Sequence, residues 1–542
     1  MRQKYEPMER IAENNFFVKT KALRLCIITA LTTILIIGLN QFTYAQAWYN
    51  SGWGYRKAIT IDYTKVPNTD QSSFPVLVNL TSDAGLLAHA LASGNDILFT
   101  SSDGTTKINY QREQYSSGTL VAWVKVPTLS HTANTVIYMY YGNSGATDQQ
   151  AATSVWDANY KGVWHLDEAT GSSSADATSN GNNAAPLNSP AQGAAKISGG
   201  LTFNGTTMED NVSSTFSLGT VNVTMECWAN LSSTSLHGAF IKIGGTSPNQ
   251  GYALGVGSGT FETAGNQIIA LYENARWIAT GVTFTTGWHH FVLVIDASGF
   301  PHVYYDGTQV YTDANGAPLA PSIITYIGGY NNSANRHFGG ILDEVCISSS
   351  VRSADWIKTE FNNQNLPSTF YSVGAETLLG PTITGFIPAS GCANTTPVVI
   401  TGTNFTGATA VKFGGTDALS FTVNSATQIT ATPAAGTTGT ISVNAPIGPT
   451  GTGTSASTFT VNSLPTASAT KTDISCFNAS NGTITVSGHG GSGSYTYYSI
   501  TNGLPPLPGN GYSTNPVFTP LAPGQYKIRV IDNNGCESKS VQ

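Results

Sequence analysis

The chain has 542 residues, a formal net charge of −7, and charged side chains at only 10% of its positions. Its 57 glycines and 24 tyrosines are typical of an extracellular all-β protein, and they argue against a mainly helical protein, which would contain more Lys, Glu, Leu and Ala. The length leaves room for about three to five domains.

The amino terminus has the layout of a secretory signal peptide. Basic residues Lys19, Lys21 and Arg24 precede an apolar run over 25–39, and small residues follow up to Ala45. We predict that residues 1–45 are a signal peptide cleaved after Ala45, and that the protein is secreted or lies on the cell surface. A single uncleaved membrane anchor is the alternative, although an apolar run of about 15 residues is short for a span.

Cleavage would make the chain more acidic. It removes six basic and three acidic residues and leaves 18 basic residues against 28 acidic ones. This charge argues against nucleic acid or an anionic membrane as a partner, and it is compatible with neutral glycans or divalent cations. We expect no membrane insertion after cleavage.

Residues 48–147 contain β-rich runs such as FPVLVNL, DILFT, LVAWVKV and TVIYMYYGN. Asp103-Gly104 predicts a hairpin, and the stretch from Asp83 to Leu91 favours a short helix. The opening W-x(4)-W-x-Y-R-K-x-I-x-I, the strand VAWVKVP and the closing MYYGN resemble a secreted bacterial domain of unknown function, DUF2341. The resemblance implies an architecture but no activity.

Residues 160–376 contain about a dozen short predicted strands, which indicate a two-sheet sandwich. Ser353 is a candidate cap for a closing helix over 354–363. The motifs VWHLDE, DATSNGNNA, GWHHFVLVID, YYDG and GGILDEVCI, in this order, resemble a laminin-G-like, concanavalin A-like jelly roll. That family is rich in lectin-like modules and also contains β-glucanases.

Two further segments resemble small β-sandwich modules. Residues 380–462 contain P-x-S-G followed by VVITGTNF, which resembles the IPT/TIG immunoglobulin-like fold. Residues 464–542 contain NGTI, GGSGSYTYY and APGQYKIRVIDNNGC, which resemble the SprB-type repeats of surface adhesins in gliding Bacteroidetes. Both resemblances imply spacer modules. Proteins with such repeats usually end in a sorting domain, whereas this sequence continues for six residues beyond Cys536.

Two adjacent carboxylates, Asp343 and Glu344, lie in the predicted strand GGILDEVCI. Successive side chains of a strand point to opposite faces, so Asp343 should share a face with Val345 and Glu344 with Cys346. A catalytic acid pair must converge on one bond, and adjacent strand residues do not. The triple spacing Glu-x-Asp-x-Glu of jelly-roll glucanases is also missing from residues 160–376. We therefore predict no enzyme activity.

Calcium is the cofactor that these carboxylates favour. The first and last strands of a jelly roll usually run side by side, which would bring HLDE and ILDE together with the polar loop that starts at Asp176. The resemblance implies one structural calcium ion, and the candidate ligands are Glu168, Asp176, Asn182 and Asp343. The alternative makes Asp343 a hydrogen-bond acceptor and leaves Glu344 in solvent. His289-His290 would point to opposite faces and favours a structural role.

Five cysteines remain after signal cleavage, and because no C-x-x-C pair exists, a zinc site is not expected. Export permits disulfides. We predict a bridge between Cys476 and Cys536, near the two ends of the last module, and a second between Cys227 and Cys346 on two jelly-roll strands. Cys392 would then be unpaired.

Aromatic residues near jelly-roll loops are candidates for stacking on sugar rings, with packing in the core or at its rim as the alternative; they are Tyr252, Tyr272, Trp277 and Tyr330. Together the segments predict an exported, all-β, multidomain surface adhesin whose jelly roll binds an extracellular glycan or a surface protein. A polysaccharide-degrading enzyme, or its accessory module, and a structural spacer without ligand are the alternatives.

Overall fold

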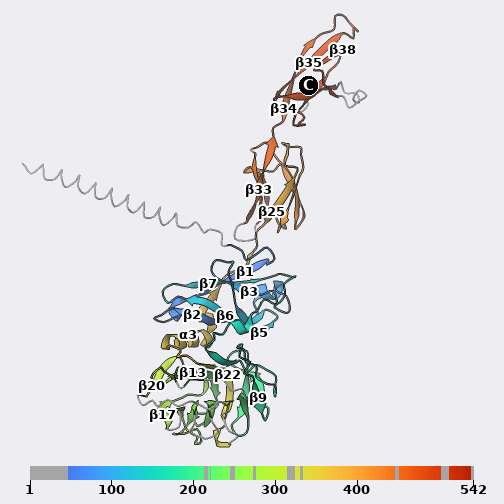
Figure 1. The fold of residues 1–542 in the computed structure, drawn as a ribbon. Coiled ribbons are helices and arrows are strands. Elements are labelled where there is room, and N and C mark those ends of the chain that lie inside the picture. Colours follow the sequence, from blue (N-terminus) through green and yellow to red (C-terminus); the bar gives the residue numbers. More distant parts are fainter. Residues whose placement is uncertain are drawn as a thin grey trace, which may run out of the picture. The chain divides into compact units, whose positions relative to one another are not determined.

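The computed structural model describes residues 47–212, 218–219, 221–244, 251–272, 276–313, 324–329, 334–436, 438–445, 451–501 and 512–538. Strands dominate these residues and the helices are few and short, which confirms the predicted all-β, multidomain fold (Figure 1). The predicted signal peptide lies outside the described residues. Among the helices that are described, none combines the length and the apolarity needed to cross a membrane.

The first domain has two antiparallel sheets around one core. The larger sheet has the order β23 (Tyr371–Val373), β1 (Tyr55–Ile61), β7 (Thr135–Tyr141), β3 (Leu98–Thr100) and β4 (Lys107–Ile108), and β24 (Thr377–Leu378) also pairs with β1. The smaller sheet has the order β2 (Gln71–Leu80), β6 (Thr119–Leu129) and β5 (Tyr110–Ser116). Alternate residues of the strands, such as Phe74, Val76 and Val78, fill the core.

Two local predictions for this domain are confirmed. Gly104 has a φ of +77° in the turn between β3 and β4, which are antiparallel neighbours. Helix α2 (Ala84–His89) begins after Asp83, whose carboxylate accepts a hydrogen bond from the backbone N–H of Leu86. A short 3₁₀ helix, η1 (Tyr63–Lys65), follows β1, and another, η2 (Ala152–Ser154), precedes the jelly roll.

The jelly roll has two sheets of eight and seven strands. The first has the order β10 (Ala191–Ala194), β11 (Gly199–Asn204), β22 (Gly339–Ser348), β13 (Val223–Leu231), β18 (Gly287–Ile295), β19 (Pro301–Tyr305) and β20 (Thr308–Thr312), with β8 (Tyr160–Trp164) paired to β22. The second has the order β17 (Arg276–Thr283), β16 (Gln267–Tyr272), β15 (Tyr252–Gly257), β14 (Gly238–Ile243), β21 (Thr325–Ile327), β12 (Glu209–Val212) and β9 (Ala184–Leu187). A short 3₁₀ helix, η3 (Ala334–Arg336), precedes β22.

A β-bulge interrupts β22 at the adjacent carboxylates. The register against β13 shifts between the pairs Trp228↔Asp343 and Glu226↔Cys346, and Glu344 has a φ of +50°. One extra residue therefore lies on β22, and both Leu342 and Val345 belong to the jelly-roll core. The predicted strict alternation of Asp343 and Glu344 is wrong, because the bulge lets both carboxylates lie on the side away from that core.

The segment after the jelly roll returns to the first domain. Helix α3 (Ala354–Asn365), capped by Ser353 as predicted, contacts β2 of the first domain and β20 of the jelly roll (Figure 1). Helix α4 (Pro367–Phe370) then leads into β23, and β23 and β24 pair with β1. We predicted residues 160–376 as one jelly roll, whereas the structure places residues 371–376 with the first domain.

Side chains from this returning segment cover the edge strand β2. The amide of Asn363 accepts a hydrogen bond from the backbone N of Leu77 at 2.7 Å and donates one to its O at 3.0 Å. The hydroxyl of Tyr371 does the same for Asn79, at 2.8 and 3.0 Å. Two side chains thus take the place of a neighbouring strand and satisfy buried backbone groups.

The last two modules are β-sandwiches. In the IPT/TIG-like module, the first sheet has the order β25 (Thr382–Ile387), β27 (Val398–Thr403), β31 (Gln428–Thr432) and β30 (Ser420–Ser425). The second sheet has the order β26 (Ser390–Cys392), β33 (Thr452–Asn462), β32 (Gly439–Asn444), β28 (Ala410–Phe413) and β29 (Thr416–Asp417). In the SprB-like module, one sheet has the order β34 (Pro465–Thr472), β35 (Gly482–Gly490) and β38 (Val517–Leu521). The other sheet has the order β37 (Tyr512–Ser513), β36 (Tyr495–Thr501) and β39 (Lys527–Asp532).

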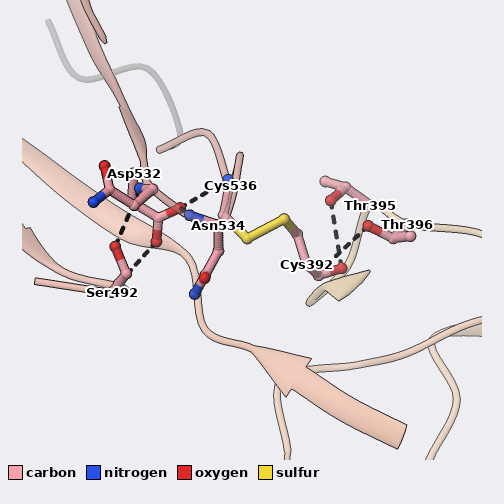
Figure 2. Close-up of a disulfide and its surroundings, with 8 residues drawn as sticks. Cys392, Thr395, Thr396, Ser492, Asp532, Asn534 and Cys536 are labelled. Carbon is pink, nitrogen blue, oxygen red and sulfur yellow. Dashed lines mark hydrogen bonds between the residues drawn. A yellow bond between two sulfur atoms is a disulfide. The ribbon is translucent and has the colours of Figure 1, made fainter. Parts of the chain in front are cut away.

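The disulfide pairing differs from both predicted bridges. Cys392 at the end of β26 is bonded to Cys536 after β39, so the bridge joins the two carboxy-terminal modules across 144 residues of sequence (Figure 2). The carboxylate of Asp532 accepts a hydrogen bond from the backbone N of Cys536 and holds the turn in place. Cys227, Cys346 and Cys476 are free. The prediction failed because it paired cysteines within modules.

Thiol labelling of the native protein checks this pairing. We expect a maleimide to modify the exposed Cys476, while Cys227 and Cys346 react only after unfolding, because burial raises the pKa of both thiols well above the usual range. Non-reducing peptide mapping should recover one pair of peptides, containing Cys392 and Cys536. A recovered Cys476–Cys536 pair would contradict the structure.

Candidate functional site

The predicted convergence of the two acidic segments is confirmed. β8 pairs with β22, so that Trp164 lies opposite Val345. Directly after β8, Nδ1 of His165 lies 2.9 Å from Oε2 of Glu344. The two strands thus bring HLDE and ILDE side by side.

The residues predicted to bind calcium hold the polar loop through hydrogen bonds. Both carboxylate oxygens of Asp176 are occupied: Oδ1 accepts from the backbone N of Val163 and of Thr178, and Oδ2 accepts from the Thr178 hydroxyl and from the backbone N of Asn182. The amide of Asn182 donates to the backbone O of Lys161 at 2.6 Å. Asp176 is therefore explained as a hydrogen-bond acceptor.

The other two predicted ligands are also acceptors. Glu168 accepts a hydrogen bond from the backbone N of Ala175 at 2.6 Å, and Asp343 accepts one from the backbone N of Ile197 at 2.7 Å. Calcium needs about six to eight oxygen ligands, and N–H groups already face several of these oxygens. All four side chains thus take part in hydrogen bonds, and calcium binding at them stays a prediction.

Within the part of the chain that the structure describes, the predicted stacking residues do not form an exposed aromatic surface. Tyr252 is fully buried in the jelly-roll core, so its predicted role in stacking on a sugar is wrong. Tyr272 and Trp277 lie on β16 and β17, but their side chains are outside the described part of the structure, as is the whole of Tyr330. Tyr252, Leu254 and Val256 point into the core at every second position of β15. The sequence of this short strand did not show which of its faces is buried.

One group of titratable side chains crosses from the first domain to the jelly roll, and we call it the Glu113 group: Glu113 on β5, His165 after β8 and Glu344 on β22. Their ligand-type atoms lie within 4.8 Å of one another. Nδ1 of His165 lies 3.6 Å from Oε2 of Glu113, which also accepts a hydrogen bond from Nε1 of Trp123 at 2.8 Å. The rings of Trp123 and Trp156 lie 5.7 and 5.9 Å from that of His165.

The Glu113 group is buried and rich in carboxyls. Glu344 is 3% exposed, so the alternative that leaves its side chain in solvent is wrong. Burial, and secondly the Glu344 carboxylate, raise the pKa of Glu113 to about 8. Burial, and then the charge of Asp167, hold the pKa of Glu344 well above its usual range. Burial, and then Glu344, do the same for the pKa of Asp343. The interface thus concentrates groups that resist ionisation.

A second group, which we call the Glu226 group, lies between the jelly roll and the helix that follows it. Glu226 on β13, His290 on β18 and Glu360 on α3 have ligand-type atoms within 4.8 Å, and Oε2 of Glu226 lies 4.0 Å from Nε2 of His290. Burial lowers the pKa of His290 to about 4, and burial, then Glu226, raise the pKa of Glu360 well above its usual range. The charge of Arg352 acts in the opposite sense on both carboxyls.

Packing covers part of the outer face of each jelly-roll sheet. On the larger sheet Val292, Val294 and Tyr304 pack against Ile357 of α3, and Nε1 of Trp228 donates to Gln364. On the smaller sheet a second cluster covers the face opposite the core: Ala239, Ala253, Phe261, Ile269, Leu271 and Tyr326.

Sequence reasoning missed the first-domain partner of these sites. Glu113 lies in the strand YQREQYS, whose alternating pattern indicates one half-buried face but no functional site. Glu226 was noted only as a single scattered acid, and Glu360 only as part of a helix. The one usable signal was the juxtaposition of HLDE and ILDE, because it placed His165 and Glu344 at the same strand pair.

Four regions of the chain match known families. Residues 204–358 match the concanavalin A-like lectin/glucanases superfamily, and residues 93–184 match a domain of unknown function, DUF2341. Residues 381–461 match the IPT/TIG domain, and residues 468–504 match the SprB repeat. All four resemblances are thereby confirmed. The DUF2341 match contains both Glu113 and His165, and the lectin-type match contains Glu344.

The solved structures that match this chain are distant. Domain 4 of AbnA, a GH43 extracellular arabinanase from Geobacillus stearothermophilus, has 16% identity, and the match covers 38% of this chain and 100% of that chain, with a TM-score of 0.31. A SAP-like pentraxin from Limulus polyphemus has 13% identity, with coverages of 29% and 78% and a TM-score of 0.24. A Trypanosoma rangeli sialidase has 15% identity, with coverages of 48% and 43% and a TM-score of 0.30, so this chain spans less than half of that enzyme.

A search of curated proteins found no match. The concanavalin A-like and immunoglobulin-like domains fit a carbohydrate-binding or surface role.

Proposed function

We propose that this chain is an exported surface adhesin that binds an extracellular glycan, or the glycan of a surface protein, through its jelly roll. The match of residues 204–358 to the concanavalin A-like lectin/glucanases superfamily carries the proposal. The IPT/TIG and SprB modules that follow it serve as spacers. The disulfide between Cys392 and Cys536 supports this role, because it ties the two spacers together.

The covered parts of the two sheet faces restrict where a ligand binds. Ile357 of α3 packs on the larger sheet, and Phe261 packs on the outer side of the smaller one. A glycan would therefore contact strand ends and the loops between them. Specificity in such a site comes from loop side chains, which explains why the fold alone names no sugar.

Burial of the acid groups supports a binding role over a catalytic one. Glu226, Glu344 and Glu360 are each 4% exposed or less. A glycosidase needs two carboxyls that both contact one glycosidic bond. These carboxyls contact a polysaccharide only if the first domain and α3 separate from the jelly roll.

A glycan array probed with the whole exported chain tests the proposal. We expect selective binding to one class of glycan, competed by the same glycan in solution, and measured in millimolar calcium and again in a chelator. Loss of binding in the chelator would support the calcium prediction. Absence of binding in both conditions would overturn the lectin role, and release of reducing ends from a bound polysaccharide would establish the hydrolase instead.

A further inference from the structure

The three side chains of the Glu113 group are spaced like the ligands of a small divalent cation. Four-coordinate zinc has N and O ligands at about 2.0–2.2 Å, which puts neighbouring ligand atoms about 3.3–3.5 Å apart. Nδ1 of His165 lies 2.9 Å from Oε2 of Glu344 and 3.6 Å from Oε2 of Glu113. The observed separations lie on either side of the expected one, so small side-chain shifts would create the site.

The Glu113 group and the adjacent Asp343 contain polar atoms that the chain leaves unsatisfied. Oε1 of Glu113 and Oδ1 of Asp343 are buried and find no hydrogen-bond partner among the described residues. Both side chains are at least nine-tenths buried. An unpaired buried carboxylate oxygen costs stability, and a bound cation would offset that cost for several carboxylates at once.

The charges around this group favour a cation. The strongest electrostatic influences on Glu113 are Glu344, His165 and Asp167, and two of these three are carboxylates. The Glu226 group differs, since the guanidinium of Arg352 acts on both of its carboxyls and its His–Glu separation is 4.0 Å. Arg352 already supplies positive charge there. The Glu113 group is therefore the better candidate of the two.

We propose that Glu113, His165 and Glu344 bind one first-row divalent metal ion of the zinc class, in a structural site shared between the first domain and the jelly roll. One imidazole nitrogen and two carboxylate oxygens suit such an ion. The rings of Trp123 and Trp156, which lie 5.5 Å from each other, both pack beside the imidazole of His165 and restrict its rotation. The ion would fasten β5 to the strand pair β8 and β22, which are separated from it by about 50 to 230 residues of sequence.

Metal content and thermal stability of the untagged whole chain test the site. The protein is unfolded in denaturant with a chelator, refolded, and titrated with zinc alone. We expect one zinc per chain by elemental analysis, and a melting temperature that rises with free zinc because the ion binds only the folded form. Cobalt(II), used as a second probe, should give the visible absorption of a four-coordinate site.

Matched substitutions identify the ligands. Glu113→Gln and Glu344→Gln keep the side-chain shape, and each should weaken zinc binding more than tenfold and abolish the zinc-dependent rise in melting temperature. Glu226→Gln, an equally buried change in the other group, should leave zinc binding unchanged. The proposal is overturned if the wild-type chain binds no zinc, if Glu113→Gln binds zinc as tightly as wild type, or if Glu226→Gln loses it.

Discussion

Residues 48–157, expressed alone, are expected to remain unfolded, whereas residues 48–379 fold. The short fragment lacks β23 and β24, which pair with both ends of β1. It also lacks Trp356, Phe370 and Tyr371, which are part of the first-domain core. Loss of one large buried aromatic side chain costs about 3–5 kcal/mol, against a total stability of about 5–15 kcal/mol for a domain.

Circular dichroism and the dispersion of amide signals in NMR would measure this outcome. A peptide spanning residues 350–379, added to the short fragment, should restore part of the folded signal. The same peptide with Phe370→Ala is the matched control and should restore less. A short fragment that folds cooperatively without the peptide would contradict the predicted dependence on the returning segment.

Arg352→Met is expected to destabilise the described domains by about 3 kcal/mol. The guanidinium of Arg352 lies 2.9 Å from the carboxylate of Asp157 and stacks 4.3 and 4.5 Å from the rings of Tyr160 and Trp356. It is 7% exposed, and its charge also offsets Glu226 and Glu360. Methionine keeps much of the volume but leaves these carboxyls without their buried cation.

Urea unfolding followed by tryptophan fluorescence would measure the loss. Arg336→Met is the control, because Arg336 pairs at 3.0 Å with the partly exposed Glu262, and a surface pair contributes about 0–1 kcal/mol. If the two substitutions lowered the free energy of unfolding by similar amounts, the buried position of Arg352 would add nothing to stability. A larger loss in Arg352→Met at unchanged urea dependence would confirm its role.

Local sequence rules predicted much of the fold but not the junction between domains. The Asp103-Gly104 hairpin and the Ser353 cap follow from turn and capping chemistry, and the pairing of the first and last jelly-roll strands follows from the family resemblance. The bulge at Glu344 does not, because sequence marks a left-handed residue clearly only where it is glycine. The assumption of strict alternation therefore placed the side chains of Asp343 and Glu344 on opposite faces of the strand.

The pairing of distant segments was the other missing element. Cys392 looked unpaired because cysteines were matched within modules, and Glu113 looked unremarkable because its partners lie on strands of another domain. No spacing rule connects residue 113 with 344, or residue 55 with 378. Contacts of this kind depend on how completed domains dock, which a single sequence does not encode in any local pattern.

The return of the chain to β1 has a mechanical consequence. Strand β1 begins the first domain, and β24, just before the carboxy-terminal modules, pairs with it at Tyr55↔Leu378 and Arg56↔Thr377. Tension between the amino terminus and those modules therefore passes through this short strand pair. The whole jelly roll, inserted between β7 and β23, stays outside the loaded path until the first domain opens. When the jelly roll holds a ligand, tension on that ligand would instead act on the interface between the jelly roll and the first domain, which α3 and the Glu113 group form.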